Sequence, residues 1–470
     1  MNGSLVSDLG RIVGPGAVST DTGLLERFGG DALGVYRAFS AAPRLDATAG
    51  VLVWPSKTDE VSRVLRFAQR HSVPVVPYGG GTGVMGAATP VQDCIVLNLQ
   101  RMNSILDISK ADLTARLQPG VVLESAAQSL SDAGLVLGHD PWSRPVATVG
   151  GAISTDGVGY TAAKHGSMGE QVLGLEAVLP DGEVVRTKGV PKQASGPSLN
   201  GLFIGSEGTL GVVTEATIRV FPSPEKHILR SIVFPDFESG FQAVAHIYSE
   251  GVRPTMVDYG VELWNGDRAS SRDTTLFLAF DGFAEDVEAH DRRAAQIGDR
   301  FGGRRGDPEE VNRFWSTRHA SGERYRREVL ESSDPGEARR RRSSYRMDYL
   351  HVALPVSRVL EYRRRCEKIL ANRRVIVREW SLWARPEFFS FLISEETDQG
   401  GDTSAAMEAT VDEVLRLAQQ MGGAMEYCHG VGIKLAHLAG DEMGTGLGVL
   451  RKIKKALDPN GILNPGKLAG

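Results

Sequence analysis

Val75-Val76-Pro77-Tyr78-Gly79-Gly80-Gly81-Thr82-Gly83-Val84-Met85-Gly86 is the stretch that decides the fold. It is an apolar strand that runs straight into a loop with five glycines in eight residues. A loop without Cβ atoms lets backbone amides approach an anion closely, so the pattern predicts a diphosphate-binding loop. The alternative interpretation is an ordinary glycine-rich turn.

The same stretch matches the dinucleotide pattern G-x-G-x-x-G at Gly81, Gly83 and Gly86. That pattern requires a helix directly after the loop, because the helix N-terminus forms part of the phosphate site. Here residues 87–93 lead into a strand-like run at 94–99, and no amphipathic helix fits between them. We therefore reject a Rossmann unit and keep the phosphate loop.

The sequence before the loop predicts a strand, then a helix, then the strand that delivers the loop. Residues 50–55 are short and apolar and end in a proline, and Thr58 is placed to cap the following helix. Asp59 and Glu60 lie in its first turn, where they complement the helix dipole. Its buried face is expected to carry Val61, Val64, Leu65 and Ala68.

Glycine-dense segments recur after the loop, at residues 138–159 and 203–216, around a predicted hairpin at 172–185. Pro222 and Pro224 mark a domain boundary, after which glycine becomes rarer and helical and strand-like stretches alternate. The run Arg339–Arg342 predicts a solvated loop, with closure over an anion or docking of a partner as the alternative.

The C-terminal part is again rich in motifs. Residues 422–432 are glycine-rich and contain Cys428-His429-Gly430. A later helix is expected to place Val449, Leu450, Ile453 and Leu457 on one face, and it stops at 458–461 before the tail 462–467.

Composition excludes several classes of protein. The chain has 470 residues, 41% of them hydrophobic and 24% charged, with a net charge of -5, which is typical of an ordinary globular protein and does not favour a nucleic-acid partner. No apolar run is long enough for a membrane span, and no secretory signal is visible. Three widely spaced cysteines argue against a disulfide framework or zinc cluster and favour the cytoplasm.

Five motifs in this order resemble the FAD-binding oxidoreductases of the vanillyl-alcohol oxidase, or PCMH, type. The nearest resemblance is to the group of the glycolate oxidase D subunit, D-lactate dehydrogenase and D-2-hydroxyglutarate dehydrogenase, over about residues 45–225 and 415–470. The motifs are Pro77–Gly83, Asp140-Pro141 with Ala147–Gly151, Gly205–Gly211, His429–Gly432 and Asp458–Lys467.

The resemblance implies an α+β fold with three parts: a two-subdomain FAD-binding domain at 1–224, an α/β cap or substrate domain at 225–415, and a C-terminal segment at 416–470 that completes the flavin site. It implies FAD as cofactor. The first loop lacks His and Cys, so we expect a non-covalent flavin. The cofactor-binding residues implied are Pro77, Tyr78, Gly79, Gly80, Gly81, Thr82, Gly83, Val84, Pro141, Ala147, Thr148, Gly150, Gly151, Ser154, Glu207, Gly208, Gly211, Val213 and Asn464.

The implied chemistry is oxidation of a 2-hydroxy acid or related alcohol by hydride transfer to flavin N5, which needs a base and a cation for the carboxylate. His429 matches the family's catalytic histidine, and an imidazole that titrates near neutral pH suits a base. Arg318 lies where the family places a carboxylate-binding arginine. Tyr427 and Arg378 are further candidates for polarising the substrate.

The chain departs from the hydroxy-acid dehydrogenases at their metal site. Cys428 stands at the position of their glutamate ligand, and the matching cap segment 375–385 contains no histidine. We therefore predict no metal of that kind. Trp380 and Trp383 of this segment are candidates to wall an aromatic or larger apolar substrate, with core packing as the alternative.

Other activities stay open on the sequence alone. They are a metal-free synthase reaction like that of alkyl-dihydroxyacetone-phosphate synthase and an alcohol, phenol or amine oxidase. A flavin-binding electron-transfer subunit is a further alternative, and the intact His429 motif argues against it. A small-molecule substrate is expected. Oxygen, a quinone and an electron-transfer protein are all candidate electron acceptors, and a homodimer is an open alternative.

Overall fold

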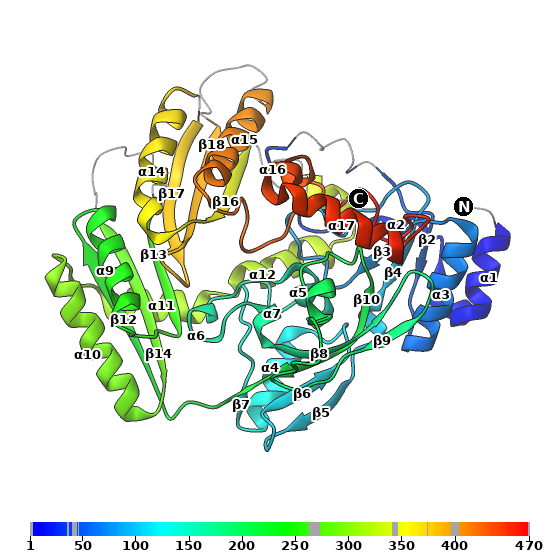
Figure 1. Cartoon of the computed structure of the whole chain (residues 1–470), viewed down its shortest axis with the longest axis horizontal. Helices are drawn as coiled ribbons and strands as arrows, with labels where there is room; N and C mark the ends of the chain where they lie inside the picture. Colours follow the sequence, from blue (N-terminus) through cyan, green and yellow to red (C-terminus); the bar gives the residue numbers. More distant parts are fainter. Residues whose placement is uncertain are drawn as a thin grey trace.

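The computed structural model describes residues 3–34, 37–39, 45, 47–262, 273–340, 346–373, 375–395 and 404–468. Helices and sheets are mixed, and the sheets build two halves, with the cap at one side and the glycine-loop domain at the other (Figure 1). Within the described residues, no helix combines the length and the apolar content that a membrane crossing needs.

The first subdomain is a small, mainly parallel sheet with strand order β1-β2-β4-β3, in which β2 and β3 run parallel to β4. Two helices, α1 and α3, bury one side of it, and their leucines and valines share its core. The elements are α1 (Gly3–Val13), β1 (Val18–Ser19), α2 (Thr22–Arg27), β2 (Val51–Val53), α3 (Thr58–His71), β3 (Val75–Tyr78) and β4 (Ile95–Asn98).

No helix lies between the glycine loop and β4, so the rejection of a Rossmann unit is confirmed. One expectation about α3 was wrong: Lys57 precedes the first turn, and Thr58 is already helical. The Thr58 hydroxyl donates instead to Glu176 Oε1 at 2.5 Å, which ties this helix to the second subdomain.

The second subdomain is an antiparallel sheet with strand order β5-β6-β10-β8-β9. Its inner face packs on α4 and α5, which build a separate apolar core. The predicted hairpin is present as β8 and β9. The elements are β5 (Ile105–Ser109), β6 (Thr114–Leu117), α4 (Leu123–Asp132), β7 (Leu135–Val136), α5 (Val149–Thr155), α6 (Ala162–His165), α7 (Met168–Gln171), β8 (Val172–Val178), β9 (Val184–Arg186), α8 (Asn200–Phe203), β10 (Val212–Arg219) and β11 (Phe221–Pro222).

The cap is a seven-stranded antiparallel sheet with strand order β15-β12-β14-β13-β17-β18-β16. Helices α9, α10, α14 and α15 supply most of the helical residues of its core. The elements are β12 (Lys226–Phe234), α9 (Phe237–Ser249), β13 (Met256–Glu262), β14 (Thr274–Gly282), α10 (Ala284–Arg300), β15 (Arg304–Arg305), β16 (Met347–Ala353), α14 (Val356–Ala371), β17 (Val375–Trp383), β18 (Phe388–Glu395) and α15 (Ser404–Gln420).

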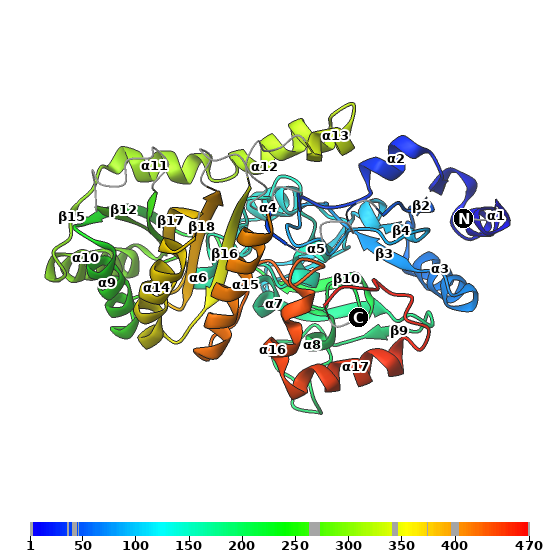
Figure 2. The same cartoon turned by 90° about the horizontal axis from the view of Figure 1, so that it is seen from above.

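A chain of short helices joins the cap to the glycine-loop domain along one edge of the molecule (Figure 2). It consists of α11 (Pro308–Thr317), α12 (Ala320–Tyr325), a π-helical turn (Arg326–Leu330) and α13 (Pro335–Arg340). The prediction of a loop at Arg339–Arg342 was therefore wrong for Arg339 and Arg340, which end a helix. Arg341 and Arg342 lie outside the described residues.

The C-terminal segment returns to the first half through α16 (Ala439–Met443) and α17 (Thr445–Leu457). The predicted apolar face of α17 is partly wrong, because Val449 is exposed and Leu447 is the buried residue. Beyond α17, the Asp458 carboxylate accepts from the amides of Ile462 and Leu463 at 3.0 and 2.8 Å. This turn brings the tail back to β3, where the backbone N–H of Asn464 donates to the carbonyl of Val75.

Candidate active site

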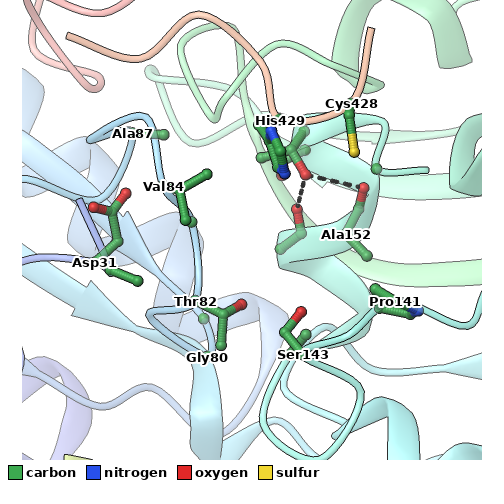
Figure 3. Close-up of a pocket in the computed structure, with 18 of the residues that line it drawn as sticks. Asp31, Gly80, Thr82, Val84, Ala87, Pro141, Ser143, Ala152, Cys428 and His429 are labelled. Atoms are coloured by element: carbon green, nitrogen blue, oxygen red, sulfur yellow. Dashed lines mark hydrogen bonds between the residues drawn. The ribbon is translucent and has the colours of Figure 1, made fainter. Parts of the chain in front are cut away.

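A single cavity of about 540 Å³ runs from the glycine loop to the cap. Its glycine-loop end is formed by Gly79–Val84 together with Thr148, and its histidine end by Tyr349, His351, Trp383 and His429. Figure 3 shows His429 and Cys428 facing Thr82 and Ser143 across the cavity. Every cofactor-binding residue expected from the sequence lines this cavity except Asn464, among the residues that the structure describes.

The glycine-loop end offers unused backbone donors. Over the described part of the chain, the amides of Gly80 to Val84 donate to no protein acceptor. The loop is held from behind, because the Tyr325 hydroxyl donates to the carbonyl of Gly81 at 2.8 Å and the Ala32 amide to that of Gly83 at 2.6 Å. The loop therefore presents a fixed row of N–H groups, which is the kind of surface that binds phosphate.

The glycines of this loop are needed mainly for packing. A Cβ on Gly80 would collide with the backbone carbonyl of Val146, and one on Gly79 would lie 2.5 Å from Thr148 Oγ1. Gly81 has a φ of +65°, and its Cβ would collide with the Tyr78 hydroxyl. The first loop and the second glycine segment thus fit against each other without room for side chains.

Thr148 completes the glycine-loop end. Its hydroxyl is buried, lines the cavity and has no hydrogen-bond partner in the described structure. It immediately precedes α5, whose close approach to the chain at Pro119 depends on Gly150, because a Cβ there would lie 2.6 Å from Pro119 Cβ. A buried, unsatisfied hydroxyl costs free energy, so a bound polar group here would stabilise the site.

Glu207 lies on the cavity wall but directs its carboxylate at the C-terminal segment. Oε1 accepts from the amides of Val431 and Gly432 at 2.5 and 2.8 Å. Burial raises the pKa of Glu207 to about 7, although these two amides lower it. Glu207 therefore fixes the turn that carries His429.

Asn464, in the C-terminal tail, also holds segments of the cavity wall together. Its Nδ2 donates to the carbonyls of Ala87 and Glu207 at 2.9 and 2.6 Å, and its side chain does not line the cavity. The sequence placed Asn464 against the flavin ring, whereas the structure places it behind the wall, where it joins the glycine loop, Glu207 and the tail.

At the histidine end, His429 lies beside a second histidine that the sequence did not indicate. The ring centroids of His351 and His429 are 4.5 Å apart, and both residues line the cavity. His351 is fully buried on β16, its Nδ1 shares a hydrogen bond of 2.8 Å with the Ser390 hydroxyl, and its Nε2 has no partner in the described structure. A histidine within a strand carries no local motif, so only the sheet could bring it here.

The surroundings shift the pKa values of the two histidines in opposite directions. Burial lowers the pKa of His351 well below its ordinary value, and the neighbouring His429 and Arg37 lower it further. Burial also lowers the pKa of His429, but Cys428 and the Glu426 carboxylate outweigh it and raise the pKa to about 10. The sequence led us to expect that His429 titrates near neutral pH, whereas its surroundings favour the protonated form at neutral pH.

Tyr427 lies behind this pair and does not line the cavity, in the part of the chain that the structure describes. Its hydroxyl shares a hydrogen bond of 2.8 Å with Ser390, the same hydroxyl that contacts His351. Its ring stacks on Phe388, with the centroids 4.3 Å apart. Tyr427 thus belongs to the support of His351.

The two tryptophans of β17 have different surroundings. Trp383 lines the cavity beside Tyr349 and His351, at 5.3 and 5.0 Å between ring centroids. Trp380 is buried in the cap core and stacks on Phe389. Only Trp383 is placed to contact a substrate.

The two arginines proposed from the sequence lie outside the described cavity wall. Arg318 Nε pairs with the buried Asp140 at 2.8 Å, and His319 and Arg144 contact the same carboxylate. Arg378 Nε donates to Ser394 Oγ at 2.8 Å. Arg318 instead ties the cap to the glycine-loop domain, and the one Lys or Arg side chain on the described cavity wall is Arg37.

Among the described residues, no cluster of three or more His, Cys, Asp or Glu side chains is arranged to hold a metal ion. The absence of a metal stays a prediction.

Comparison with known proteins gives two matches to family models. Residues 49–188 match the FAD binding domain, and residues 223–468 match the C-terminal domain of FAD linked oxidases.

The similar curated proteins include a D-lactate dehydrogenase of Archaeoglobus fulgidus, 31% identical over 91% of this chain and 93% of its own. The glycolate oxidase subunit GlcD of Bacillus subtilis is 29% identical over 92% of this chain and 91% of its own.

Two solved structures share the fold. An alkyldihydroxyacetonephosphate synthase has a TM-score of 0.77 at 19% identity, covering 99% of this chain and 86% of its own. p-Cresol methylhydroxylase with substrate bound has a TM-score of 0.76 at 20% identity, covering 99% and 96%. The predicted α+β, PCMH-type fold is thereby confirmed.

Proposed function

The chain belongs to the FAD-linked oxidases and is an FAD-dependent oxidoreductase, and we propose that it oxidises a 2-hydroxy acid or a related alcohol. The observation that carries this proposal is the pair His351 and His429, which faces the same cavity as the glycine loop. The similarity to a D-lactate dehydrogenase and to a glycolate oxidase subunit supports the substrate class.

The residues at the glycine-loop end fit FAD. The free amides of Gly80 to Val84 would hold the diphosphate, and the unpartnered hydroxyl of Thr148 would donate to the cofactor. When bound, FAD supplies the hydride acceptor of the reaction. We propose that it is held non-covalently, as expected from a first loop without His or Cys.

The histidine end supplies the acid–base chemistry. Oxidation of an alcohol releases a hydride from carbon and a proton from oxygen, and the proton needs an acceptor at the substrate hydroxyl. Two groups whose pKa values are pushed apart divide such a task. We assign the neutral Nε2 of His351 as the acceptor and the protonated His429 as the cation that polarises the substrate oxygen.

Ser390 and Tyr427 hold His351 in position through the hydroxyl contact at Nδ1. Their side chains lie away from the cavity, so we assign them no contact with substrate.

The test is anaerobic mixing of the holoenzyme with a panel of D- and L-2-hydroxy acids and simple alcohols. A matching substrate should bleach the visible flavin band and leave the 2-oxo acid or carbonyl product in equal amount. Release of a product without any bleaching would instead indicate chemistry without net redox change, like that of a synthase. If no hydroxy acid or alcohol bleaches the flavin, the proposed substrate class is wrong.

We further propose a small-molecule substrate and a cytoplasmic location, as the sequence predicts. Reoxidation of the bleached enzyme by oxygen, by a soluble quinone or by an electron-transfer flavoprotein identifies the acceptor in the same apparatus. Gel filtration of the holoenzyme decides between a monomer and a homodimer.

A further inference from the structure

Arg37 stands apart from the other arginines of the chain. It comes from the N-terminal segment, yet it is nine-tenths buried and lines the cavity between the two domains. No other Lys or Arg lies on the cavity wall among the described residues. A buried guanidinium is always charged, so its position needs compensating partners.

Those partners occupy only part of the guanidinium. Nε pairs with Asp348 Oδ1 at 2.7 Å, and one terminal nitrogen donates to the Tyr349 carbonyl at 3.1 Å. The other terminal nitrogen, Nη1, donates to no group in the described structure. A guanidinium has five N–H donors, so Arg37 keeps unused donors on Nη1. These lie beside Tyr349, which is on the same strand as His351.

The Asp348 carboxylate is also shared with a second cation. Lys434 is fully buried, and its Nζ lies 3.0 and 2.9 Å from Asp348 Oδ1 and Oδ2. The cluster Arg37–Asp348–Lys434 thus sets two basic side chains against one carboxylate. Burial lowers the pKa of Lys434, whereas Asp348 and the more distant Glu426 raise it. The protonated Lys434 therefore draws part of the Asp348 charge away from Arg37. Such a cluster leaves Arg37 able to accept a further anion.

We infer that Arg37 is the site for an anionic group of the substrate, a carboxylate, and that Asp348 and Lys434 set its charge and position. This inference rests on the proposed function, because it names the residue that holds the acid end of the hydroxy acid. Arg318, expected from the sequence, already pairs with Asp140. With the carboxylate at Arg37, the hydroxyl end would lie toward His351, two residues beyond Tyr349 on β16.

The test titrates the holoenzyme with oxalate, a small dicarboxylate that cannot be oxidised by hydride loss, and follows the shift of the flavin absorption band. Charge-assisted hydrogen bonds to arginine predict that Arg37→Met weakens oxalate binding by about 10- to 100-fold. Arg37→Lys should weaken it less. Arg230→Met is the matched control, because Arg230 also pairs with an aspartate, Asp291, but lies away from the described cavity wall.

The charge argument makes a sharper prediction. In Lys434→Met, Asp348 neutralises Arg37, so oxalate binding should weaken although Arg37 is intact. In Asp348→Asn with Lys434→Met, the uncompensated charge returns, and binding should recover toward the wild-type value. FAD content and thermal melting are measured for each protein, so that a folding defect is recognised and Arg37→Lys then carries the comparison.

Three results would overturn the inference. They are unchanged oxalate binding in Arg37→Met and Arg37→Lys, loss of FAD from Arg37→Met while the apoprotein melts as the wild-type apoprotein does, which would assign Arg37 to the cofactor diphosphate, and failure of the double variant to recover any binding. The proposed function fails separately. If oxalate binding depends on Arg37 but no hydroxy acid bleaches the flavin, the anion site stands and the assigned reaction does not.

Discussion

The two ends of the cavity are built in different ways. The glycine-loop end is made of backbone amides from one short segment, packed against a second glycine-rich segment. The histidine end is made of side chains from the N-terminal segment, two strands of the cap and the C-terminal turn. A site made of backbone needs residues without side chains, whereas a site made of side chains needs the whole fold to bring them together.

The difference also appears in what holds each end in place. The glycine loop is fixed by close packing and by the hydroxyl of Tyr325. The histidine end is fixed by polar contacts between distant segments, such as Glu207 to the amides of Val431 and Gly432. Substitution should therefore abolish cofactor binding at the first end and slow the chemistry at the second.

The largest effect is expected from Gly80→Val. A Cβ at Gly80 collides with the Val146 carbonyl, which is backbone and cannot move aside, so the free amides would be displaced. We expect almost complete loss of bound FAD, measured by flavin absorbance per protein. Gly201→Ala is the control, because no atom lies within 4 Å of a Cβ there. Normal FAD content in Gly80→Val would show that the loop does not hold the cofactor.

At the histidine end, His351→Asn and His429→Asn should each keep FAD and slow flavin reduction by roughly 10²- to 10⁴-fold, the usual range for a positioned acid–base group. In the wild type, a neutral His351 and a protonated His429 predict a rate that is level through neutral pH and falls as the pH approaches about 10. His429→Asn should remove that fall.

Stopped-flow reduction across pH checks the assignment. A wild-type rate that instead rises with pH, and loses the rise in His429→Asn, would make His429 the base, as the sequence indicated. Wild-type rates in both variants would remove the pair from the mechanism.

A smaller effect is expected from the groups behind the pair. Ser390→Ala removes the hydrogen bond to His351 Nδ1, and Tyr427→Phe removes only the contact to Ser390. A neutral hydrogen bond contributes about 0.5–1.5 kcal/mol, so we expect at most about a tenfold loss of rate for Ser390→Ala and less for Tyr427→Phe. The pH profile should shift in Ser390→Ala. A larger loss for Tyr427→Phe than for Ser390→Ala would give Tyr427 a direct role.

The smallest effect concerns stability. The pKa of Glu207 is raised to about 7 in the folded chain, above the ordinary value of 4.5, so the folded state binds this proton more tightly than the unfolded state. The stability that it contributes is present below about pH 4.5 and is lost as the pH rises through about 7. The melting temperature of the wild type minus that of Glu207→Gln should therefore decrease between these pH values. If this difference in melting temperature stays constant or increases with pH, the pKa of Glu207 is not raised in the folded state.

The sequence by itself was sufficient for the glycine-loop end. Glycine density, the missing helix after the loop and the ordered motifs are local features of the sequence. A site made of backbone amides from one short segment depends mainly on such local features. The fold class, the cofactor and nearly all of the expected wall residues followed from the family resemblance that these motifs carry.

Only the tertiary structure decided the histidine end. His351 and Arg37 carry no motif. They reach the cavity because β16 places Met347, Tyr349 and His351 on one face, and because Arg37 pairs with Asp348 of the same strand. The structure likewise moved Arg318, Tyr427 and Asn464 to supporting positions, since each finds a partner far away in the sequence. The charge state of His429 also depends on which groups surround it, and burial and neighbouring charges exist only once the chain has folded.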